Sequence, residues 1–429
     1  MKVQEPETQA DESTRGALRE VPFMGVIWVV HEASKRGFWN GHPDWCNLGQ
    51  GQPEVGPMEG APPRISDVHL EPADHAYGPL GGTDELRDAI AAHYNRLYRA
   101  GKQPYTRANV AVAQGGRLAL TRAAAVLAPG TIGYQLPDYT AYEDMLELHL
   151  ARITPVALRT RESDGFRLRA DDFERSAVEQ GLRAFLFSNP CNPTGNVVAG
   201  AELAELVAIC RARRVTLLSD EFYSHFHYTT AGEPAAGPVS AAAFVDDVER
   251  DPILIVDGLT KSFRYPGWRV GWAVGPRAMI DSLSRGASSI DGGPSRIAQR
   301  AALQALEPAR ADQETTALRK VFARKRNLMV ERLERMGIRC QPKPLSTFYC
   351  WASLENLPGE LSDSRKFFWA ALERKVMTVP GPFFDVNPGK RRGDGGESPY
   401  RQWMRFSFGP SEDNLRLGLD RLAELVRGA

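Results

Sequence analysis

The sequence has few of the features that mark specialised classes of protein. Its 429 residues include five cysteines with no CxxC spacing, which argues against a disulfide framework and against a zinc site. Lys and Arg together number 53, as do Asp and Glu, so the formal net charge is zero. This balance predicts neither a nucleic-acid partner nor a membrane partner. The longest early apolar run, Val21 to Val30, is too short to span a bilayer.

The amino terminus also lacks the pattern of a secretion signal. Residues 1–19 are polar and mixed in charge, whereas a signal peptide has a basic start followed by an apolar run. Cysteine usage favours a reducing compartment, and we therefore predict a cytoplasmic protein. The remaining composition, 42% hydrophobic and 25% charged, is that of an ordinary globular chain with one large domain and a smaller one.

The chain does contain a regular alternation of short apolar runs and helical patterns. The runs are about four or five mostly apolar residues long without polar alternation, which is typical of strands buried on both faces of a parallel sheet. They lie at Val110–Ala113, Ile132–Leu136, Ala184–Phe187, Val215–Leu218, Ile253–Val256 and Val270–Val274. The predicted fold class is α/β, with a large domain whose helices sandwich a mainly parallel central sheet and a smaller α+β domain.

The predicted domain boundaries follow from where this alternation starts and stops. We expect a mobile N-terminal arm at residues 1–20 and a segment at 21–60 that contributes to the small domain and to an active-site loop. The large domain would occupy residues 61–310, and the C-terminal small domain residues 311–429. The basic, glycine-rich stretch 387–401 (NPGKRRGDGGESPYR) is predicted to be a mobile loop.

Several polar or aromatic residues follow the apolar runs at the points where ligands bind to open α/β sheets. Lys261 comes shortly after one run, Asp220 closes another in DEFY, and Tyr139 follows a third in PDY. Asn192 lies in SNPCNPTG, where two Asn-Pro pairs impose extended backbone and turns. Each residue also has a plainer explanation: a solvated lysine, a helix-capping or ion-paired aspartate, a core tyrosine, a proline-rich loop.

Two further patterns are typical of anion binding. Gln114-Gly115-Gly116-Arg117 connects an apolar run to a helical pattern, so backbone N–H groups at a helix start would face an anion; a tight turn without a ligand is the alternative. Arg405 lies within an apolar strand pattern, MRFSF, and a guanidinium suits two-point binding of a carboxylate. An edge-strand arginine that faces solvent is the alternative for Arg405.

Taken in order, these residues resemble the class I/II aminotransferases, the fold type I pyridoxal 5'-phosphate (PLP) enzymes that include aspartate, alanine and kynurenine aminotransferases. The resemblance covers nearly the whole chain from about Pro22 onward. Its elements are a glycine turn, an aromatic residue, NPxNPTG, DxxY, a lysine, an arginine eight residues later and a late RxSF. This ordered combination is highly specific.

The resemblance implies a role for each matched residue. Lys261 would form the Schiff base (internal aldimine) with the cofactor, and Asp220 would pair with the pyridine nitrogen. Asn192 and Tyr223 would hold the phenolic oxygen, and Lys261, Asp220 and Tyr223 would be catalytic. The ring would stack on Tyr139. The remaining contacts would come from Gly115, Gly116, Arg117, Arg269 and the neighbouring subunit's tyrosine equivalent to Tyr77 for the phosphate, and from Gly51, Asn192 and Arg405 for the substrate.

The implied function is transfer of an amino group from an L-amino acid to a 2-oxo acid by a homodimer with shared active sites and no metal ion. Relatives on the same framework perform elimination, cyclisation and oxidation, so a lyase, cyclase or oxidase in a specialised biosynthetic pathway is the alternative. Gly258, where the family usually has serine, and Arg117, where a small or hydroxyl residue is common, leave room for it. A non-catalytic PLP-binding regulator is a third reading, but residues 1–21 are too short for the winged-helix domain of such relatives.

Substrate choice is only weakly indicated by the sequence. Phe23, Trp28 and Trp39 favour an apolar or aromatic substrate. Arg285 would instead serve a dicarboxylate from the partner subunit.

Overall fold

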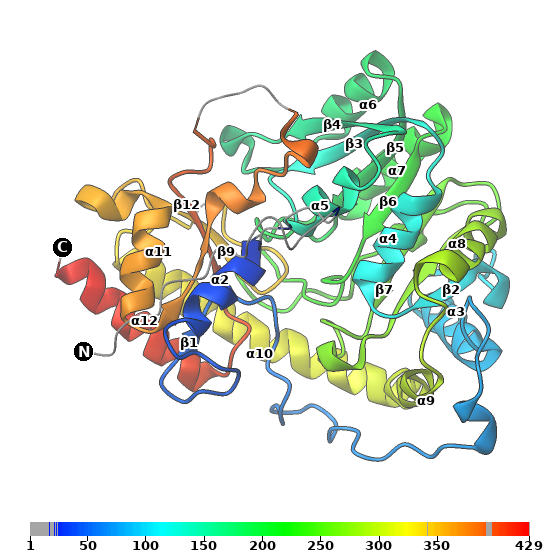
Figure 1. Cartoon of the computed structure of the whole chain (residues 1–429), viewed down its shortest axis with the longest axis horizontal. Coiled ribbons are helices and arrows are strands. Elements are labelled where there is room, and N and C mark those ends of the chain that lie inside the picture. The colour runs from blue at the N-terminus through cyan, green and yellow to red at the C-terminus, as the bar shows by residue number, and fades with distance from the viewer. Residues whose placement is uncertain are drawn as a thin grey trace.

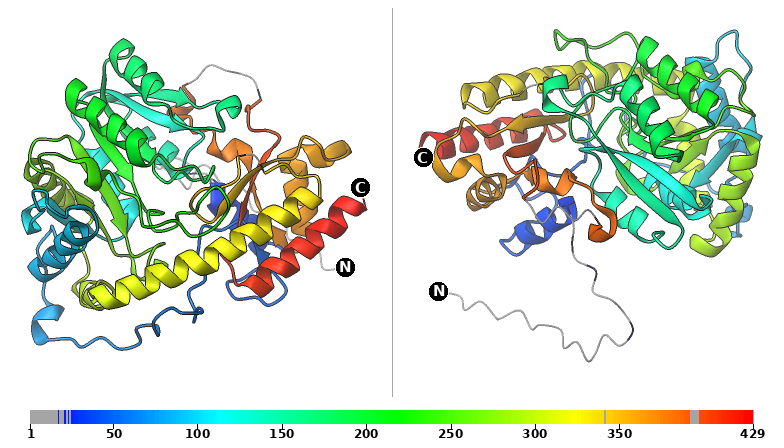
Figure 2. Two further views of the ribbon diagram at one scale, coloured as in Figure 1. Left: turned by 180° about the vertical axis from the view of Figure 1, so that it is seen from behind. Right: turned by 90° about the horizontal axis from the view of Figure 1, so that it is seen from above.

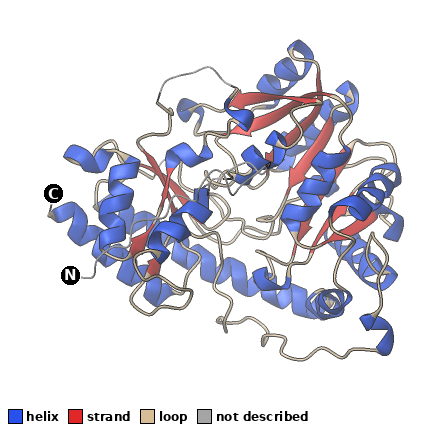
Figure 3. Cartoon of the chain, in the orientation of Figure 1, coloured by secondary structure: helices blue, strands red, loops and turns tan. Residues whose placement is uncertain are grey.

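The computed structural model describes residues 17, 21, 23, 25–340, 342–391 and 397–428. Apart from Ala17, the predicted arm at 1–20 lies outside the described residues, as does the middle of the predicted loop at 387–401. The described strands form two groups, one within a large helix-covered sheet and one within a smaller assembly that contains the C-terminal part of the chain (Figures 1 and 3).

A seven-stranded sheet forms the centre of the larger group. Its strand order is β2-β8-β7-β6-β5-β3-β4; β8 pairs antiparallel with both neighbours, and the other pairs are parallel. The strands are β2 (Val110–Ala113), β3 (Gly130–Leu136), β4 (Ile153–Arg159), β5 (Leu182–Ser188), β6 (Thr216–Asp220), β7 (Ile253–Gly258) and β8 (Gly271–Val274). The predicted mainly parallel α/β fold is confirmed.

Helices cover both faces of this sheet, which explains the uninterrupted apolar runs. In β7, Leu254 and Val256 join one hydrophobic core, whereas Ile253 and Ile255 join another on the opposite face. The helices of this part are α3 (Asp84–Tyr98), α4 (Gly116–Val126), α5 (Ala141–Glu147), α6 (Ala170–Glu179), α7 (Gly200–Arg213), α8 (Arg277–Ile290) and α9 (Arg296–Ala305).

The sequence did not predict β4, which lies at the edge of the sheet. Its sequence, ITPVALR, includes a proline, and only Ile153 and Leu158 are buried among its residues. An edge strand needs no continuous apolar run, because one of its sides has no neighbouring strand. The pattern that located the other strands was therefore absent here.

A smaller group of elements contains the C-terminal part of the chain. Its sheets are β11-β12-β9 and the two-stranded β1-β10, in which Cys46 pairs with Val376 and Asn47 with Met377. This pairing supports our proposal that residues 21–60 contribute to the small domain. The elements are α2 (Gly25–Ser34), β1 (Cys46–Asn47), β9 (Tyr349–Ser353), α11 (Ser364–Glu373), β10 (Val376–Met377), β11 (Val379–Pro380), β12 (Trp403–Ser407) and α12 (Glu412–Arg427).

The longest described helix, α10 (Pro308–Arg335), runs from the large group to the small group, where it lies beside α12 (Figure 2). It starts with Pro308 at the first helical position, and the Glu307 side chain accepts hydrogen bonds from the N–H groups of Ala309 and Arg310. One helix therefore contributes to the packing of both groups.

The described ends of the 387–401 stretch are attached to the rest of the protein. Lys390 forms an ion pair with Glu143 of α5. Arg401 forms an ion pair with Asp363 at 2.7 Å. Within the residues that the structure describes, no helix combines the length and apolar character needed to cross a membrane.

A buried ion pair fastens α10 to the loop that follows β7. Arg264, which is fully buried, directs its Nε at Glu314 Oε1 at 2.5 Å. Its Nη1 donates to the carbonyl oxygens of Glu54 (3.0 Å) and Gly56 (2.8 Å). The guanidinium thus joins three segments that are distant in sequence, and one of them includes the predicted active-site loop.

Replacing Glu314 with glutamine should destabilise the protein strongly. The change would leave the Arg264 guanidinium buried without its counter-charge, and breaking a buried pair typically costs about 3–5 kcal/mol. Urea denaturation followed by circular dichroism measures the effect. The matched control is Glu59→Gln, which removes an exposed carboxylate paired with Lys320 and Arg324 and should shift the transition little. Equal shifts for both variants would contradict this assignment.

Candidate active site

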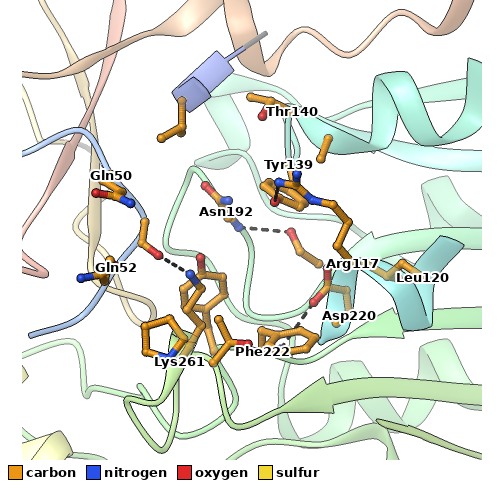
Figure 4. Close-up of a pocket in the computed structure, with 18 of the residues that line it drawn as sticks. Gln50, Gln52, Arg117, Leu120, Tyr139, Thr140, Asn192, Asp220, Phe222 and Lys261 are labelled. Carbon is orange, nitrogen blue, oxygen red and sulfur yellow. Dashed lines mark hydrogen bonds between the residues drawn. The ribbon is translucent and has the colours of Figure 1, made fainter. Parts of the chain in front are cut away.

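A cavity of about 470 Å³ opens where the parallel strands end at their carboxyl termini (Figure 4). Its walls come from the residues after β3, β5, β6 and β7, the start of α4, the loop at 50–52, α2 and β12. The structure brings most of the predicted site residues together there, namely Gly51, Gly116, Arg117, Tyr139, Asn192, Asp220, Tyr223, Lys261, Arg269 and Arg405.

Two predicted residues do not line this cavity. Gly115 lies behind it, at the N-cap of α4. Tyr77 is fully exposed in the loop before Gly81. The predicted contact of Tyr77 with a neighbouring subunit therefore stays a prediction.

Lys261 presents its amine to the cavity from the loop after β7. The Nζ donates a hydrogen bond to the carbonyl oxygen of Gly51 (Figure 4). Withdrawal of the amine from bulk water, reinforced by the positive charge of Arg405, lowers the pKa of Lys261 to about 7, while Asp220 opposes the shift. Near neutral pH a large share of this amine is uncharged and nucleophilic, which does not fit the alternative of a solvated surface lysine.

Asp220 is the last residue of β6 and is buried at the floor of the cavity. Its Oδ2 accepts a hydrogen bond of 2.7 Å from the hydroxyl of Tyr142. Burial raises the pKa of Asp220 to about 6, although that hydrogen bond and the charge of Lys261 oppose the shift. A buried carboxylate of this kind is stabilised by a cationic ligand group beside it.

Arg405 lies in the middle strand of the β11-β12-β9 sheet and is buried, so the alternative of a solvent-facing edge arginine is wrong. Its Nη1 donates to Asn192 Oδ1 at 2.8 Å and its Nη2 to the Gly49 carbonyl at 2.5 Å. Its Nε has no hydrogen-bond partner among the described residues. The carboxamide oxygen of Asn192 already accepts a hydrogen bond from Arg405. The side-chain amide nitrogen of Asn192 is therefore the group that can donate to a ligand.

The start of α4 forms an anion cradle. Gly115 has φ = +85°, and a Cβ there would lie 2.4 Å from Arg269 Nη2, so a side chain would displace this guanidinium. As the N-cap residue, Gly115 provides no side-chain cap for the first N–H groups of the helix. These groups and the Arg269 guanidinium are therefore available to a phosphate.

The structure also explains Gly258, which departs from the family pattern. A Cβ at this position would lie 2.5 Å from the Val270 carbonyl oxygen and 3.1 Å from the ring of Phe222. The same ring packs against Gly116, where a Cβ would lie 1.9 Å from it. Phe222 therefore fills the space between the two glycines, and a serine at 258 would not fit.

The charges that face the cavity are unbalanced. Lys261, Arg117, Arg269 and Arg405 line it, against the carboxylates of Asp144 and Asp220. No ion pair joins any of the four cations to a carboxylate in the part of the chain that the structure describes. Such a cavity suits a ligand with several negative charges. Within the described residues, no cluster of His, Cys, Asp or Glu is placed to hold a metal ion.

Sequence reasoning missed two tyrosines of the site. Tyr142 comes three residues after Tyr139 and near the start of α5, and this helical spacing is a signal that could have revealed it. Tyr349 begins β9, and its hydroxyl lies 2.7 Å from that of Tyr223. Its position in the apolar strand pattern FYCW (residues 348–351) suggests only core packing.

Of the three aromatic residues expected to favour an apolar or aromatic substrate, only one lines the cavity. Phe23 lines the cavity. Trp28 instead packs against Phe368, Trp369 and Phe383, and Trp39 is exposed beside His42, so neither contributes to the pocket. An apolar face of a helix serves the core as readily as a ligand, and sequence cannot separate the two. Arg285 lies on α8 and does not line the cavity of its own chain.

The lowered pKa of Lys261 predicts selective reactivity in the ligand-free protein. The neutral amine is the reactive form, so labelling of Lys261 by an acylating reagent should rise with pH and reach half its maximum near pH 7. The exposed Lys320 provides the comparison within the same protein. Peptide mapping by mass spectrometry after labelling at several pH values measures both. Parallel profiles for the two lysines would contradict the assignment. In Asp220→Asn, the Lys261 midpoint should fall further, because Asp220 raises this pKa.

Comparison with known proteins agrees with this geometry. The family model for aminotransferase class I and II matches residues 43–422. The chain is 28% identical to the aspartate aminotransferase of Sulfurisphaera tokodaii over 89% of each chain. It is 30% identical to the aspartate/prephenate aminotransferase of Cereibacter sphaeroides over 90% of this chain and 92% of the relative. The solved aspartate aminotransferase from Thermus thermophilus with maleate is similar at a TM-score of 0.76 and 25% identity, over 95% of this chain and 100% of that chain.

Proposed function

Because the chain belongs to the class I and II aminotransferases, we propose that it transfers the amino group of an L-amino acid to a 2-oxo acid with PLP bound at Lys261. The observation that carries the proposal is the convergence of Lys261, Asp220 and Arg405 on one cavity with excess positive charge. No feature of this cavity favours the lyase, cyclase or oxidase reading, and the relatives compared above are aminotransferases.

The described residues fit each part of this cofactor. Asp220 would hold the proton of the ring nitrogen, and the charged nitrogen would compensate for the burial of this carboxylate. Asn192 and Tyr223 would donate to the phenolic oxygen, and Tyr139 would lie against the ring. Arg269 and the first N–H groups of α4 would bind the phosphate. When bound, PLP supplies the electron sink for the carbon that loses its proton.

Two side chains would act on the substrate. Arg405 would bind the α-carboxylate with its guanidinium, whose Nε has no other described partner. This contact would orient the substrate so that its Cα–H bond faces Lys261. The Nζ of Lys261, with its pKa lowered to about 7, would then accept the proton from the substrate Cα.

For the substrate, we propose an amino acid with an acidic side chain. Arg117 faces the cavity, with its Nη2 donating to the Tyr139 hydroxyl at 2.9 Å, and this leaves the guanidinium able to bind a second carboxylate. Val26 and Ile27 of α2 give the opposite wall apolar side chains, against which the methylene groups of the substrate would lie. The names of the relatives support this choice, since aspartate is a dicarboxylate.

We also propose a homodimer, in which the exposed Tyr77 reaches the phosphate of the neighbouring subunit. The full exposure of Tyr77, on a loop near the glycine pair at 81–82, leaves its side chain accessible to a second subunit, which supports this role.

The visible absorption of the PLP-loaded protein tests the proposed activity. The cofactor band should bleach on addition of an amino acid and return on addition of a 2-oxo acid. Lys261→Ala should abolish this cycle, because it removes both the attachment point and the base, whereas the exposed-lysine control Lys320→Ala should retain it. Release of pyruvate or ammonia with an unchanged band would support a lyase instead.

Donor preference tests the role of Arg117. Arg117→Met should lower kcat/KM for aspartate and glutamate by about 10- to 100-fold, since a charged hydrogen bond contributes about 1.5–3 kcal/mol. The values for alanine and phenylalanine should change little, and Arg117→Lys should retain part of the preference. A uniform loss across all four donors would mean that Arg117 serves the cofactor rather than the side chain of the substrate.

A further inference from the structure

We propose that Tyr349 is a positioning residue that couples the carboxylate-binding Arg405 to Tyr223, the tyrosine assigned to the phenolic oxygen of the cofactor. The inference rests on the proposed function and assigns a role to a residue that no pattern in the sequence distinguishes from the core.

Tyr349 contacts both residues that it would connect. It is fully buried and lines the cavity, and its hydroxyl oxygen lies 2.7 Å from that of Tyr223. The centroid of its ring lies 4.1 Å from the guanidinium carbon of Arg405. This is the geometry of a cation–π contact in a site shielded from water, where such a contact is strongest.

The strand pairing holds these groups in place. Arg405 is opposite Trp351 and Ser407 is opposite Tyr349 in the β12-β9 ladder. Because side chains two residues apart on a strand share a face, the Tyr349 ring lies diagonally across from Arg405. Positioning by a sheet is more rigid than positioning by a loop.

The loop at 50–52 makes room for the Tyr349 hydroxyl. A Cβ at Gly51 would lie 2.4 Å from this oxygen and 3.8 Å from Lys261 Nζ. The absence of a side chain at Gly51 therefore lets the tyrosine hydroxyl and the lysine amine occupy the same corner of the cavity. The glycine that the family resemblance assigns to substrate binding thus also has a packing role.

The direction of the tyrosine–tyrosine hydrogen bond follows from the number of protons. Each hydroxyl has one proton, and the 2.7 Å between the two oxygens is the length of a hydrogen bond in which either hydroxyl can be the donor. If Tyr223 donates its proton to the phenolic oxygen, Tyr349 must donate to Tyr223. A hydroxyl that accepts a hydrogen bond becomes a better donor, so Tyr349 would strengthen the Tyr223 contact.

Arg405 would act on this chain through its charge. Burial raises the pKa of Tyr349 and of Tyr223, and the positive charge of Arg405 opposes both shifts, which makes both hydroxyls stronger donors along this chain. A substrate carboxylate bound to Arg405 would neutralise the charge and weaken the donation. Carboxylate binding would then weaken the hydrogen bonding to the phenolic oxygen through Tyr349 and Tyr223. This effect would add to the one transmitted through the hydrogen bond between Arg405 and Asn192.

The test is the pH titration of the visible absorption of the PLP-loaded full-length protein. Loss of a donor disfavours negative charge on the phenolic oxygen, so the bound cofactor should retain its proton to higher pH in Tyr349→Phe. We expect the midpoint to rise by about 0.4–1 pH unit, the equivalent of one hydrogen bond. Addition of saturating maleate should raise the midpoint of the wild type and raise that of Tyr349→Phe by less.

A double variant separates action through Tyr223 from a direct effect. Tyr223→Phe should raise the midpoint more than Tyr349→Phe does, and adding Tyr349→Phe to it should cause no further change. Full additivity would overturn the proposed coupling. The matched control is Tyr228→Phe, which removes a buried hydroxyl bonded to the Thr347 carbonyl at 2.7 Å outside the cavity and should leave the midpoint unchanged.

Cofactor affinity provides a second readout that does not depend on turnover. Tyr349→Phe should raise the Kd of PLP, measured by fluorescence quenching, by about 2- to 10-fold. A variant with wild-type midpoint and wild-type Kd would overturn this inference alone. A wild-type protein that binds no PLP would overturn the proposed function together with it.

Discussion

The excess of positive charge in the cavity is the constraint on which the rest of the site depends. Withdrawing cations from water without counter-charges is unfavourable, and the folded protein bears this cost at Lys261 and Arg405. Its consequence is visible in the lowered pKa of Lys261, whose amine is brought close to neutrality by burial and neighbouring charge. An anionic ligand would relieve the repulsion, so the same arrangement that costs stability prepares the cavity for binding.

Both groups of elements contribute to holding these cations together. In the large sheet, Asp220 ends β6 and Lys261 lies in the loop after β7, whereas Arg405 comes from the middle strand of the small sheet. The ion pair between Arg264 and Glu314 fastens the loop after β7 to α10, and the same guanidinium holds the carbonyl groups of the N-terminal loop. The relative positions of the amine and the guanidinium therefore depend on contacts made by residues other than Lys261 and Arg405.

The tyrosines give the site a second level of organisation. Tyr142 donates to the carboxylate of Asp220, and Tyr349 is linked to Tyr223 and lies against Arg405. In each case a buried hydroxyl contacts a residue with an assigned role rather than filling space. Hydrogen bonds between buried groups are strengthened by the low local dielectric, so these second contacts can tune the groups that touch a ligand.

The sequence by itself determined where most strands of the central sheet lie and which functional residues follow them along the chain. Apolar runs identified most strands of the central sheet because both faces are buried, and the residues directly after those runs were the ones that met in the cavity. The edge strand β4 was not predicted because its burial is incomplete. Trp28 was misassigned because a core contact and a ligand contact have the same local sequence pattern.

Only the tertiary structure decided that Tyr349 faces Tyr223 and Arg405. Tyr349 and Tyr223 are 126 positions apart in the sequence, and the contact with Arg405 depends on how β9 and β12 pair. It also decided that Gly258 must remain glycine, because the Phe222 ring and the backbone of β8 occupy the space that a side chain would need. Local sequence specifies backbone conformation and burial, whereas which side chains meet depends on how distant segments pack.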